Sequence, residues 1–104
     1  MATHKEKEQE KLKLLYDIYE QPMYRIAYAI LHHTEQAEDA VSDAFLRILK
    51  NLKKIGDVRS EKTKHYIISI IRSTAINQYR QNQRDSERYT AVSYTHLRAH
   101  ETGR

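Results

Sequence analysis

The sequence of 104 residues contains no cysteine, one proline and two glycines. Without cysteine there can be no disulfide framework, no thiolate zinc site and no cysteine nucleophile, and this composition suits a reducing cytoplasm. Because β-sheet proteins place glycine and proline at their turns, the scarcity of both residues favours helix along nearly the whole chain. A chain of this length can bury one small hydrophobic core but not two. We therefore expect a single all-α domain.

Long apolar runs are missing as well. No stretch approaches the roughly 18 apolar residues that a transmembrane helix requires, and the N-terminal sequence MATHKEKEQEK has no apolar segment of the kind found in signal peptides. We therefore expect a cytoplasmic protein with no membrane partner. The sequence contains no glycine-rich phosphate loop and no Gly-x-Ser-x-Gly elbow, and no carboxylate pair falls on a predicted cleft. These absences favour a protein that is not an enzyme, with no catalytic residues and no cofactor.

Histidines are the residues that could suggest a metal site. His32 and His33 are adjacent, so on a helix their side chains would point about 100° apart and could not easily share a ligand. We expect them at a polar helix end instead. His96 and His100 have the spacing of two zinc ligands and are followed by Glu101, but the order differs from the His-Glu-x-x-His of metalloproteases. We predict no metal site.

Positive charge is concentrated in one part of the chain. The formal net charge is +4, and residues 59–88, with seven basic and three acidic side chains, account for a surplus of that size. A local positive field of this kind attracts a polyanion such as a nucleic acid. A basic helix face can equally be a solvated surface. The charge distribution alone therefore leaves both interpretations open.

A first helix is predicted from Leu12 to Ile30. The mixed-charge segment before it, residues 1–11, is either an N-terminal extension or the start of this helix. Pro22 cannot donate a backbone hydrogen bond and clashes with the preceding turn, so we expect either a kink or a restart with Pro22 in a first turn. The apolar positions follow the i, i+3, i+4, i+7 spacing of a one-faced helix: Leu12, Leu15, Tyr19, Met23, Ile26, Ala27 and Ile30.

A second helix is predicted to begin with Thr34 as its N-cap and to end near Lys54. The threonine hydroxyl could accept a hydrogen bond from an unpaired backbone amide of the first turn. The following segment, IGDVRSEKT, shows no periodicity and is expected to be a loop. The apolar residues of this helix fall on one broad stripe: Ala37, Ala40, Val41, Ala44, Phe45, Ile48, Leu49 and Leu52.

A third helix is predicted to begin between Ser60 and Thr63 and to end by about Arg84. Together the helices indicate a compact bundle of three to four helices over residues 12–88. Residues 89–104 have no apolar stripe to bury and are expected to form a poorly ordered tail. The stripe of the third helix contains Ile67, Ile68, Ile70, Ile71, Ala75, Ile76 and Tyr79.

The second helix carries a ridge of side chains opposite its apolar stripe, spaced three and four residues apart. This ridge is either a solvated surface or a binding surface for a partner that is basic and partly apolar. Its members are Asp39, Ser42, Asp43, Leu46 and Lys50.

The third helix carries side chains suited to nucleic acid on or near the face opposite its isoleucines. Arginine makes bidentate contacts with guanine or phosphate, and asparagine and glutamine pair with adenine. Tyr66 offers a ring on which an unstacked base could lie. The residues of this face are Arg72, Asn77, Arg80, Gln81 and Arg84, and those that could follow a phosphate backbone just before it are Arg59, Lys62, Lys64 and His65.

Two stretches, LYDIYEQPMYRIAYAILHHTEQAEDAVSDAFLRILKNL and KTKHYIISIIRSTAINQYRQNQR, resemble region 2 of sigma-70 family RNA polymerase sigma factors of the extracytoplasmic-function type. The resemblance covers about residues 12–88. Its most specific parts are the run Ala37, Glu38, Asp39 with Phe45 six residues on, and the later spacing of Tyr66, Ile67, Ile70, Arg72, Ile76 and Arg80.

The resemblance implies two macromolecular partners. The second helix would bind the clamp helices of the β′ subunit of core RNA polymerase, with Asp39 and Asp43 making outward contacts and Phe45 supporting them from the core side. The third helix and the loop before it would recognise and help to melt the minus-ten promoter element, with the 55–65 loop holding a base flipped out of the non-template strand. An anti-sigma factor is a further partner compatible with the family. The residues implied to face the DNA are Arg72, Asn77, Arg80 and Arg84.

The sequence also departs from the family pattern. Ser42 replaces a usual glutamine, which affects one polymerase hydrogen bond. Tyr66, Ser73 and Asn77 replace a common tryptophan, asparagine and aspartate, and we expect these changes to alter promoter preference more than fold. A complete member continues into a domain that reads the minus-thirty-five element, so we expect a truncated chain with a foreign tail, SYTHLRAHET. The alternative to a sigma factor is a non-catalytic helical interaction module with a solvated basic face.

Overall fold

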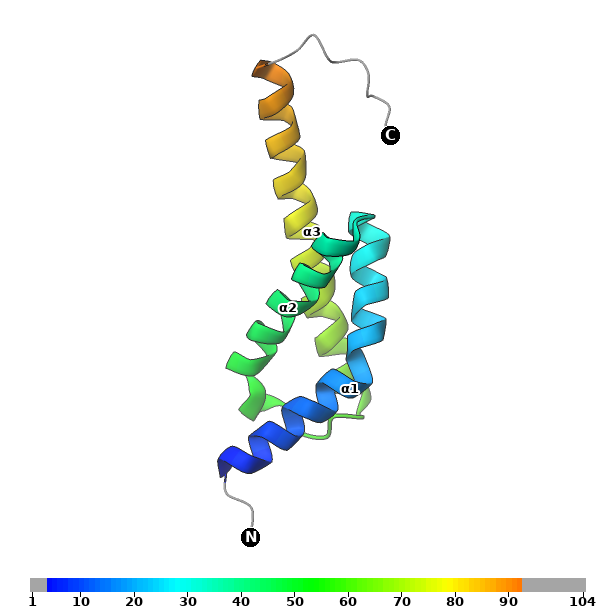
Figure 1. Cartoon of the computed structure of the whole chain (residues 1–104). Helices are drawn as coiled ribbons and strands as arrows, with labels where there is room; N and C mark the ends of the chain where they lie inside the picture. The colour runs from blue at the N-terminus through cyan, green and yellow to red at the C-terminus, as the bar shows by residue number, and fades with distance from the viewer. Residues whose placement is uncertain (1–3, 93–104) are drawn as a thin grey trace.

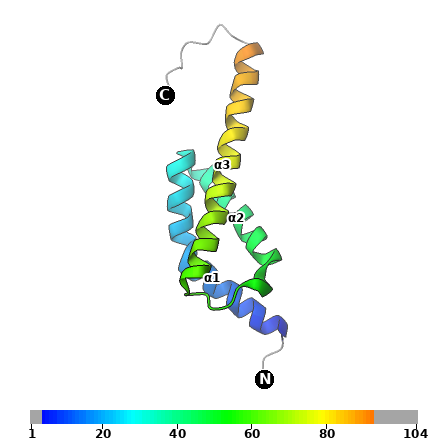
Figure 2. The same ribbon diagram turned by 180° about the vertical axis from the view of Figure 1, so that it is seen from behind.

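A computed structural model describes residues 4–92 of the chain, and side chains for residues 6–86. Within this range there is no β-strand, and each α-helix packs against the other two (Figures 1 and 2). The prediction of an all-α bundle of three to four helices is therefore confirmed. In chain order the elements are α1 (His4–Leu31), α2 (Thr34–Lys50), the short 3-10 helix η1 (Leu52–Lys54) and α3 (Glu61–Val92).

Helix α1 continues through Pro22 without a break in its assignment. Figure 1 shows that its N-terminal part and its C-terminal part point in different directions. A proline inside a helix removes one backbone hydrogen bond and crowds the preceding turn, which produces such a bend. Of the two outcomes expected at Pro22, the structure therefore shows a kink and not a restart.

The turn between α1 and α2 is built from two histidines. His32 has a left-handed backbone, with φ of 54°, and its amide donates to the carbonyl of Tyr28 at 2.7 Å. The next residue, His33, is extended, with φ of −149° and ψ of 121°, and its Nδ1 accepts a hydrogen bond from the amide of Gln36 at 3.2 Å. The prediction of Thr34 as the N-cap is therefore wrong. His33 is the extended residue between left-handed His32 and the first residue of α2, so His33 takes the N-cap position.

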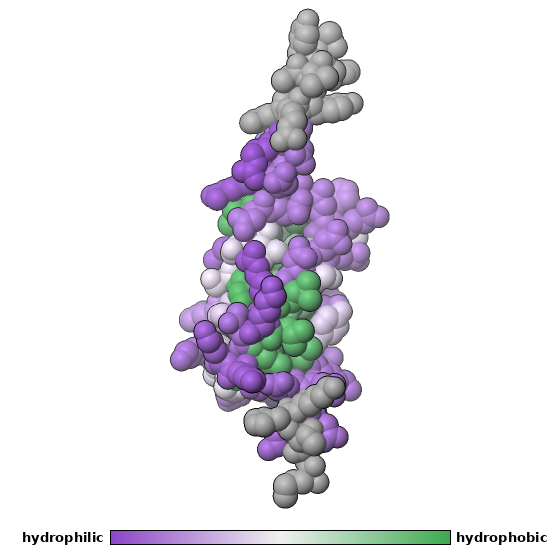
Figure 3. Space-filling view, turned by 90° about the vertical axis from the view of Figure 1, so that its left-hand side faces the viewer, coloured by the Kyte–Doolittle hydropathy of each residue, from purple (hydrophilic) through white to green (hydrophobic). Residues whose placement is uncertain are grey.

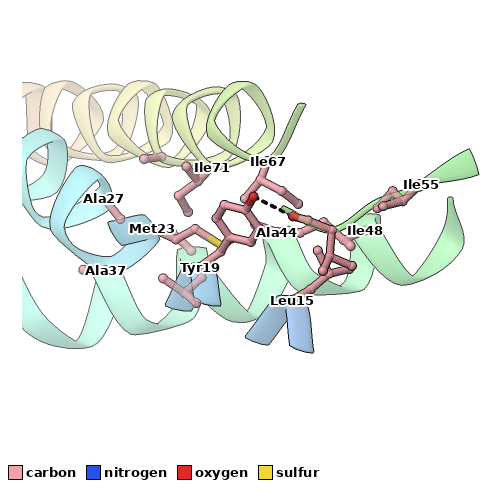
Figure 4. Packing of buried hydrophobic residues seen from close by; sticks show 14 of the residues in the cluster. Leu15, Tyr19, Met23, Ala27, Ala37, Ala44, Ile48, Ile55, Ile67 and Ile71 are labelled. Atoms are coloured by element: carbon pink, nitrogen blue, oxygen red, sulfur yellow. Dashed lines mark hydrogen bonds between the residues drawn. The ribbon is translucent and has the colours of Figure 1, made fainter. Parts of the chain in front are cut away.

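The hydrophobic core lies where the helices meet (Figure 4). Five of its residues are alanines, which let the helix backbones approach closely, and the larger side chains fill the space between them. Each large side chain that is fully buried contributes about 1.5–3 kcal/mol. The buried apolar residues of the α-helices are Leu15, Tyr19, Met23, Ala27, Leu31, Ala37, Ala40, Val41, Ala44, Ile48, Ile67, Ile71 and Ala75.

The end of α2 differs from the prediction. The α-helix ends at Lys50 and the chain continues into η1, not as one helix to Lys54. Leu49 was predicted on the apolar stripe but is 48% exposed, because a helix turns about 100° per residue and so carries Leu49 away from buried Ile48. Conversely, Ile55 and Val58 are buried in the core, although their segment shows no periodicity. The loop between α2 and α3 therefore belongs to the folded core.

Side chains of α1 hold this loop in place. The Nζ of Lys11 donates to the carbonyl of Ile55 at 2.6 Å and lies 3.4 Å from the carbonyl of Leu52. The buried hydroxyl of Tyr19 donates to the carbonyl of Val58 at 2.7 Å, the dashed line in Figure 4. Because buried carbonyls need partners, these contacts stabilise the path of the loop against α1.

Helix α3 begins where the sequence predicted it to begin. The Oγ of Ser60 accepts a hydrogen bond from the amide of Thr63 at 3.2 Å, and the hydroxyl of Thr63 donates to the carbonyl of Asp57 at 2.7 Å. A serine at the N-cap position satisfies one of the unpaired amides of the first turn. The predicted start between Ser60 and Thr63 is therefore confirmed.

Helix α3 is longer than predicted. It runs to Val92, not to Arg84, so the first residues of the predicted poorly ordered tail are helical, and the rest of that tail lies outside the described residues. Polar pairs one turn apart support this part of the helix without an apolar stripe: Nε2 of Gln81 donates to Asp85 at 3.2 Å. Tyr79 was predicted on the stripe but is 44% exposed. The C-terminal part of α3 extends beyond α1 and α2 (Figure 1).

Candidate functional site

The ridge of α2 faces outward. Each of its five members is exposed, and Leu46 is the most exposed of the large hydrophobic side chains, at 58%. Phe45, which lies beside the ridge, is partly buried against the core. An exposed leucine on the same ridge as two aspartates offers both apolar area and negative charge to a partner. The ridge consists of Asp39, Ser42, Asp43, Leu46 and Lys50.

A groove of about 720 Å³ runs between this ridge and α1. The ring of Tyr16 lies 5.0 Å from the ring of Phe45, centre to centre, and the Tyr16 hydroxyl donates to Oε2 of Glu20 at 2.7 Å. That hydrogen bond and the nearby negative charge raise the pKa of Tyr16 above its ordinary value. These α1 residues were not among the predicted candidates, although their spacing of four residues beside the buried stripe indicates a shared face. The groove is lined by Tyr16, Glu20, Gln21, Tyr24, Glu38, Val41, Ser42, Phe45 and Leu46.

The nucleic-acid candidates on α3 are all exposed, but they do not form one row. Arg72 lines a hollow of about 390 Å³ on the outer face of α3, together with His65. Asn77 and Gln81 instead line a groove of about 410 Å³ between α3 and α2. The structure therefore divides the predicted set between two faces of α3, because Asn77 and Gln81 lie five and nine positions after Arg72, about 140° and 180° around a helix.

The remaining arginines of this set continue along α3. Arg80 is exposed. Arg84 donates from Nη2 to Oε1 of Gln81 at 2.9 Å, and Gln81 donates in turn to Asp85. These contacts hold Arg84 and Gln81 side by side at the part of α3 that extends from the bundle.

Two of the cations predicted to follow a phosphate backbone lie at a further, mostly apolar hollow. Arg59 and Lys64 form part of its wall, and its volume is about 320 Å³. Lys62 and His65 are exposed near the start of α3. Tyr66 is partly buried against the core, so only part of its ring faces solvent. The other residues that line this hollow are Ile18, Tyr19, Pro22, Met23, Ile67 and Ile68.

Tyr19 connects this hollow to the core. Its ring is buried, and its hydroxyl is the group that binds the carbonyl of Val58. Burial raises the pKa of the Tyr19 phenol, and the negative charges of Glu61 and Asp57 raise it further. The hydroxyl therefore stays protonated near neutral pH and keeps its role as a donor.

An amide chain joins α2 to α3 at the other end of the bundle. Nδ2 of Asn82 donates to Oε1 of Gln36 at 2.6 Å, and Oδ1 of Asn82 accepts from Nε2 of Gln78 at 2.9 Å. These hydrogen-bonded amides were not predicted, because neither periodicity nor composition distinguishes a paired amide from a solvated one. They fix the position of α3 relative to the helix that carries the ridge.

Two further findings concern other kinds of site. Among the described residues, no group of three or more histidine, cysteine, aspartate or glutamate side chains is arranged to hold a metal ion. His96 and His100 lie outside the described residues. In the part of the chain that the structure describes, no helix combines the length and the apolar character needed to span a bilayer.

Comparison with known proteins identifies the family. The family model for sigma-70 region 2 matches residues 15–85, and the chain belongs to this family. A similar protein is the ECF RNA polymerase sigma factor SigX of Bacillus subtilis (strain 168), with 32% identity over 75 residues. The aligned part covers 72% of this chain and 38% of that relative. No solved structure matches the chain. The resemblance to an extracytoplasmic-function sigma factor is thereby confirmed.

Proposed function

We propose that this domain acts in transcription initiation by binding core RNA polymerase and an unpaired promoter strand on separate surfaces. The observation that carries the proposal is the separation of charge on adjacent helices of one bundle. The ridge of α2 exposes Asp39 and Asp43, whereas α3 and the loop before it expose arginines, lysines and amides. Membership of the sigma-70 region 2 family supports this assignment of partners. A site of action in the cytoplasm is part of the same proposal.

The ridge and the adjoining groove form the proposed polymerase surface. Leu46, Phe45 and Tyr16 supply apolar contact area, and Asp39, Asp43 and Glu20 supply negative charge. Figure 3, which views the side of the molecule on which α2 lies in Figure 1, shows apolar surface surrounded by hydrophilic side chains. A helix of the β′ clamp that carries basic and apolar side chains would complement this surface. The proposed contacts from the ridge are Asp39, Ser42, Asp43, Phe45, Leu46 and Lys50.

The loop and α3 form the proposed DNA surface. The mostly apolar hollow beside the loop could accept a base removed from the stack, while Arg59 and Lys64 at its wall attract the phosphate backbone. Extruding a base costs a few kcal/mol, which stacking against the protein and charge neutralisation can offset. Arg72, Arg80 and Arg84 would continue the contacts along α3. The other proposed contacts are Lys62, His65, Tyr66, Asn77 and Gln81.

The polymerase half of the proposal is tested with the isolated β′ clamp helices. We expect Asp39→Ala/Asp43→Ala to lower the affinity of the full chain at least about tenfold, since charged residues at the centre of an interface contribute more than 1 kcal/mol. Isothermal titration calorimetry gives the affinity, and circular dichroism shows whether the variant is folded.

The charge-matched control is Glu10→Ala/Asp17→Ala, which removes two exposed acids of α1 that lie outside the groove. This control should bind the clamp helices as the wild type does. If both double variants lose the same affinity, the effect is one of net charge and the ridge is not the binding surface. If the chain binds the clamp helices but no single-stranded DNA, it is an interaction module with a solvated basic face.

A further inference from the structure

The groove between α2 and α3 contains a buried hydroxyl without a partner. Thr74 is 6% exposed and lines this groove, so it lies at the floor of the groove and not at its rim. Its Oγ1 has no hydrogen-bond partner in the described part of the chain. A buried hydroxyl that has left water without gaining a partner destabilises the fold, and a bound water, ion or polar ligand is one way to satisfy such a group.

Two cations lie on the α2 side of the same groove. Arg47 and Lys50 are exposed, and neither side chain has an ion pair or a hydrogen bond with another of the residues that the structure describes. On the α3 side, the amide of Asn77 is also free of a described partner. Two positive charges, an amide and a hydroxyl therefore line one groove, a set of donors that suits a phosphate group.

One carboxylate, that of Asp43, belongs to the groove as well. Helices α2 and α3 run in opposite directions (Figures 1 and 2), and the bond between Gln36 and Asn82 joins the start of α2 to the later part of α3. Lys50 therefore lies toward the Thr74 end of the groove, and Asp43 lies toward the Gln81 end. The charge of the groove is positive at one end only, which suits one phosphate and not a row of them.

We propose that this groove binds one phosphodiester of the unpaired DNA strand. Arg47 and Lys50 neutralise its charge, and the hydroxyl of Thr74 and the amide of Asn77 donate hydrogen bonds to its oxygens. Lys50, where the ridge meets the groove, becomes a DNA contact in place of the polymerase contact proposed above. The inference rests on the proposed function, because it takes the strand to be the one that α3 engages. It adds residues of α2 to a surface otherwise formed by α3 and the loop.

Salt dependence tests the charged part of the proposal. The full chain is titrated into a fluorescent single-stranded oligodeoxynucleotide of minus-ten-like sequence at several salt concentrations, with anisotropy as the readout. Each phosphate neutralised on a single strand contributes about 0.7 to the slope of log affinity against log salt. We expect Arg47→Gln/Lys50→Gln to lower the affinity and to reduce the slope by about that amount. The control Lys13→Gln/Arg25→Gln, on the exposed surface of α1, should leave the slope closer to that of the wild type.

Substitution of Thr74 tests the hydroxyl. Thr74→Val keeps the shape of the side chain and removes a polar group without a partner, so the free protein should be as stable as the wild type or more stable. The same variant should bind the oligonucleotide several-fold more weakly, and Thr74→Ser should restore binding. A purely structural role for Thr74 would make stability and affinity change in the same direction.

The outcomes separate this inference from the function on which it rests. If the wild type binds neither the oligonucleotide nor the clamp helices, the proposed function fails. If the wild type binds DNA and the groove variants match their control in affinity and slope, the phosphate site is refuted while the proposed function stands. If the groove variants lose the clamp helices and keep the DNA, the groove belongs to the polymerase surface and the inference is wrong.

Discussion

At the scale of single residues, Tyr19 has the clearest double role, because its ring fills the core while its hydroxyl fixes the loop. Tyr19→Phe keeps the ring and leaves the buried carbonyl of Val58 without its donor. We expect the free energy of unfolding to fall by about 1–2 kcal/mol, the cost of an unsatisfied buried group. Urea denaturation followed by circular dichroism measures this change.

Tyr28→Phe is the matched control for Tyr19→Phe. Tyr28 is also on α1, is 43% exposed and lines none of the grooves described above. Its substitution should change the free energy of unfolding by less than about 0.5 kcal/mol, as is usual for surface positions. Equal losses in both variants would show that the bond from Tyr19 to the loop contributes no stability of its own.

At the scale of elements, the start of α2 depends on His33 and not on Thr34. His33→Ala removes the acceptor for the amide of Gln36. We expect the free energy of unfolding to fall by about 0.5–1 kcal/mol, as at other N-caps, and the melting temperature to fall with it. Thr34→Ala serves as the control and should be nearly neutral, because alanine is at least as good a helix former at that position. A larger loss from Thr34→Ala than from His33→Ala would contradict the observed cap.

Much of the helical architecture could be predicted from the sequence. Apolar residues on the buried face of a helix recur every three or four positions, and this period is visible in the sequence. The stripes of α2 and α3 contain Ala37, Ala44, Ile48, Ile67 and Ile71, and all of these residues are buried. The start of α3 could also be predicted, because a serine just before the first helical residue is a local signal for an N-cap. These features depend on neighbours in the sequence.

Other features depend on contacts between distant segments and could not be predicted. Ile55 and Val58 lie in the core, and the side chains of Lys11 and Tyr19 donate hydrogen bonds to their backbone carbonyls. The partners are 44 and 39 residues apart in the sequence. The groove that Asn77 and Gln81 line depends on where α2 packs against α3, which periodicity does not specify. The ridge of α2 could be found from spacing, whereas the α1 wall of its groove and the unpaired hydroxyl of Thr74 required the packed structure.

At the scale of the whole molecule, a small bundle presents two separate surfaces. The acidic and apolar ridge of α2 adjoins α1, and the cationic and amide-rich surface lies on α3 and the loop, with Arg47 and Lys50 of α2 at its groove. Helices that pack against one another through a shared core hold both surfaces in a fixed relation. Polymerase and DNA are therefore expected to bind to the same domain at the same time, without competition for one site.

Simultaneous binding is the most direct test of this claim. The full chain is first saturated with the fluorescent minus-ten-like oligonucleotide, and the β′ clamp helices of Bacillus subtilis RNA polymerase are then added while anisotropy is followed. We expect a second, saturable rise in anisotropy, because a ternary complex tumbles more slowly than the binary one. A fall to the value of the free oligonucleotide would show that the two partners compete for one surface, and would contradict the account.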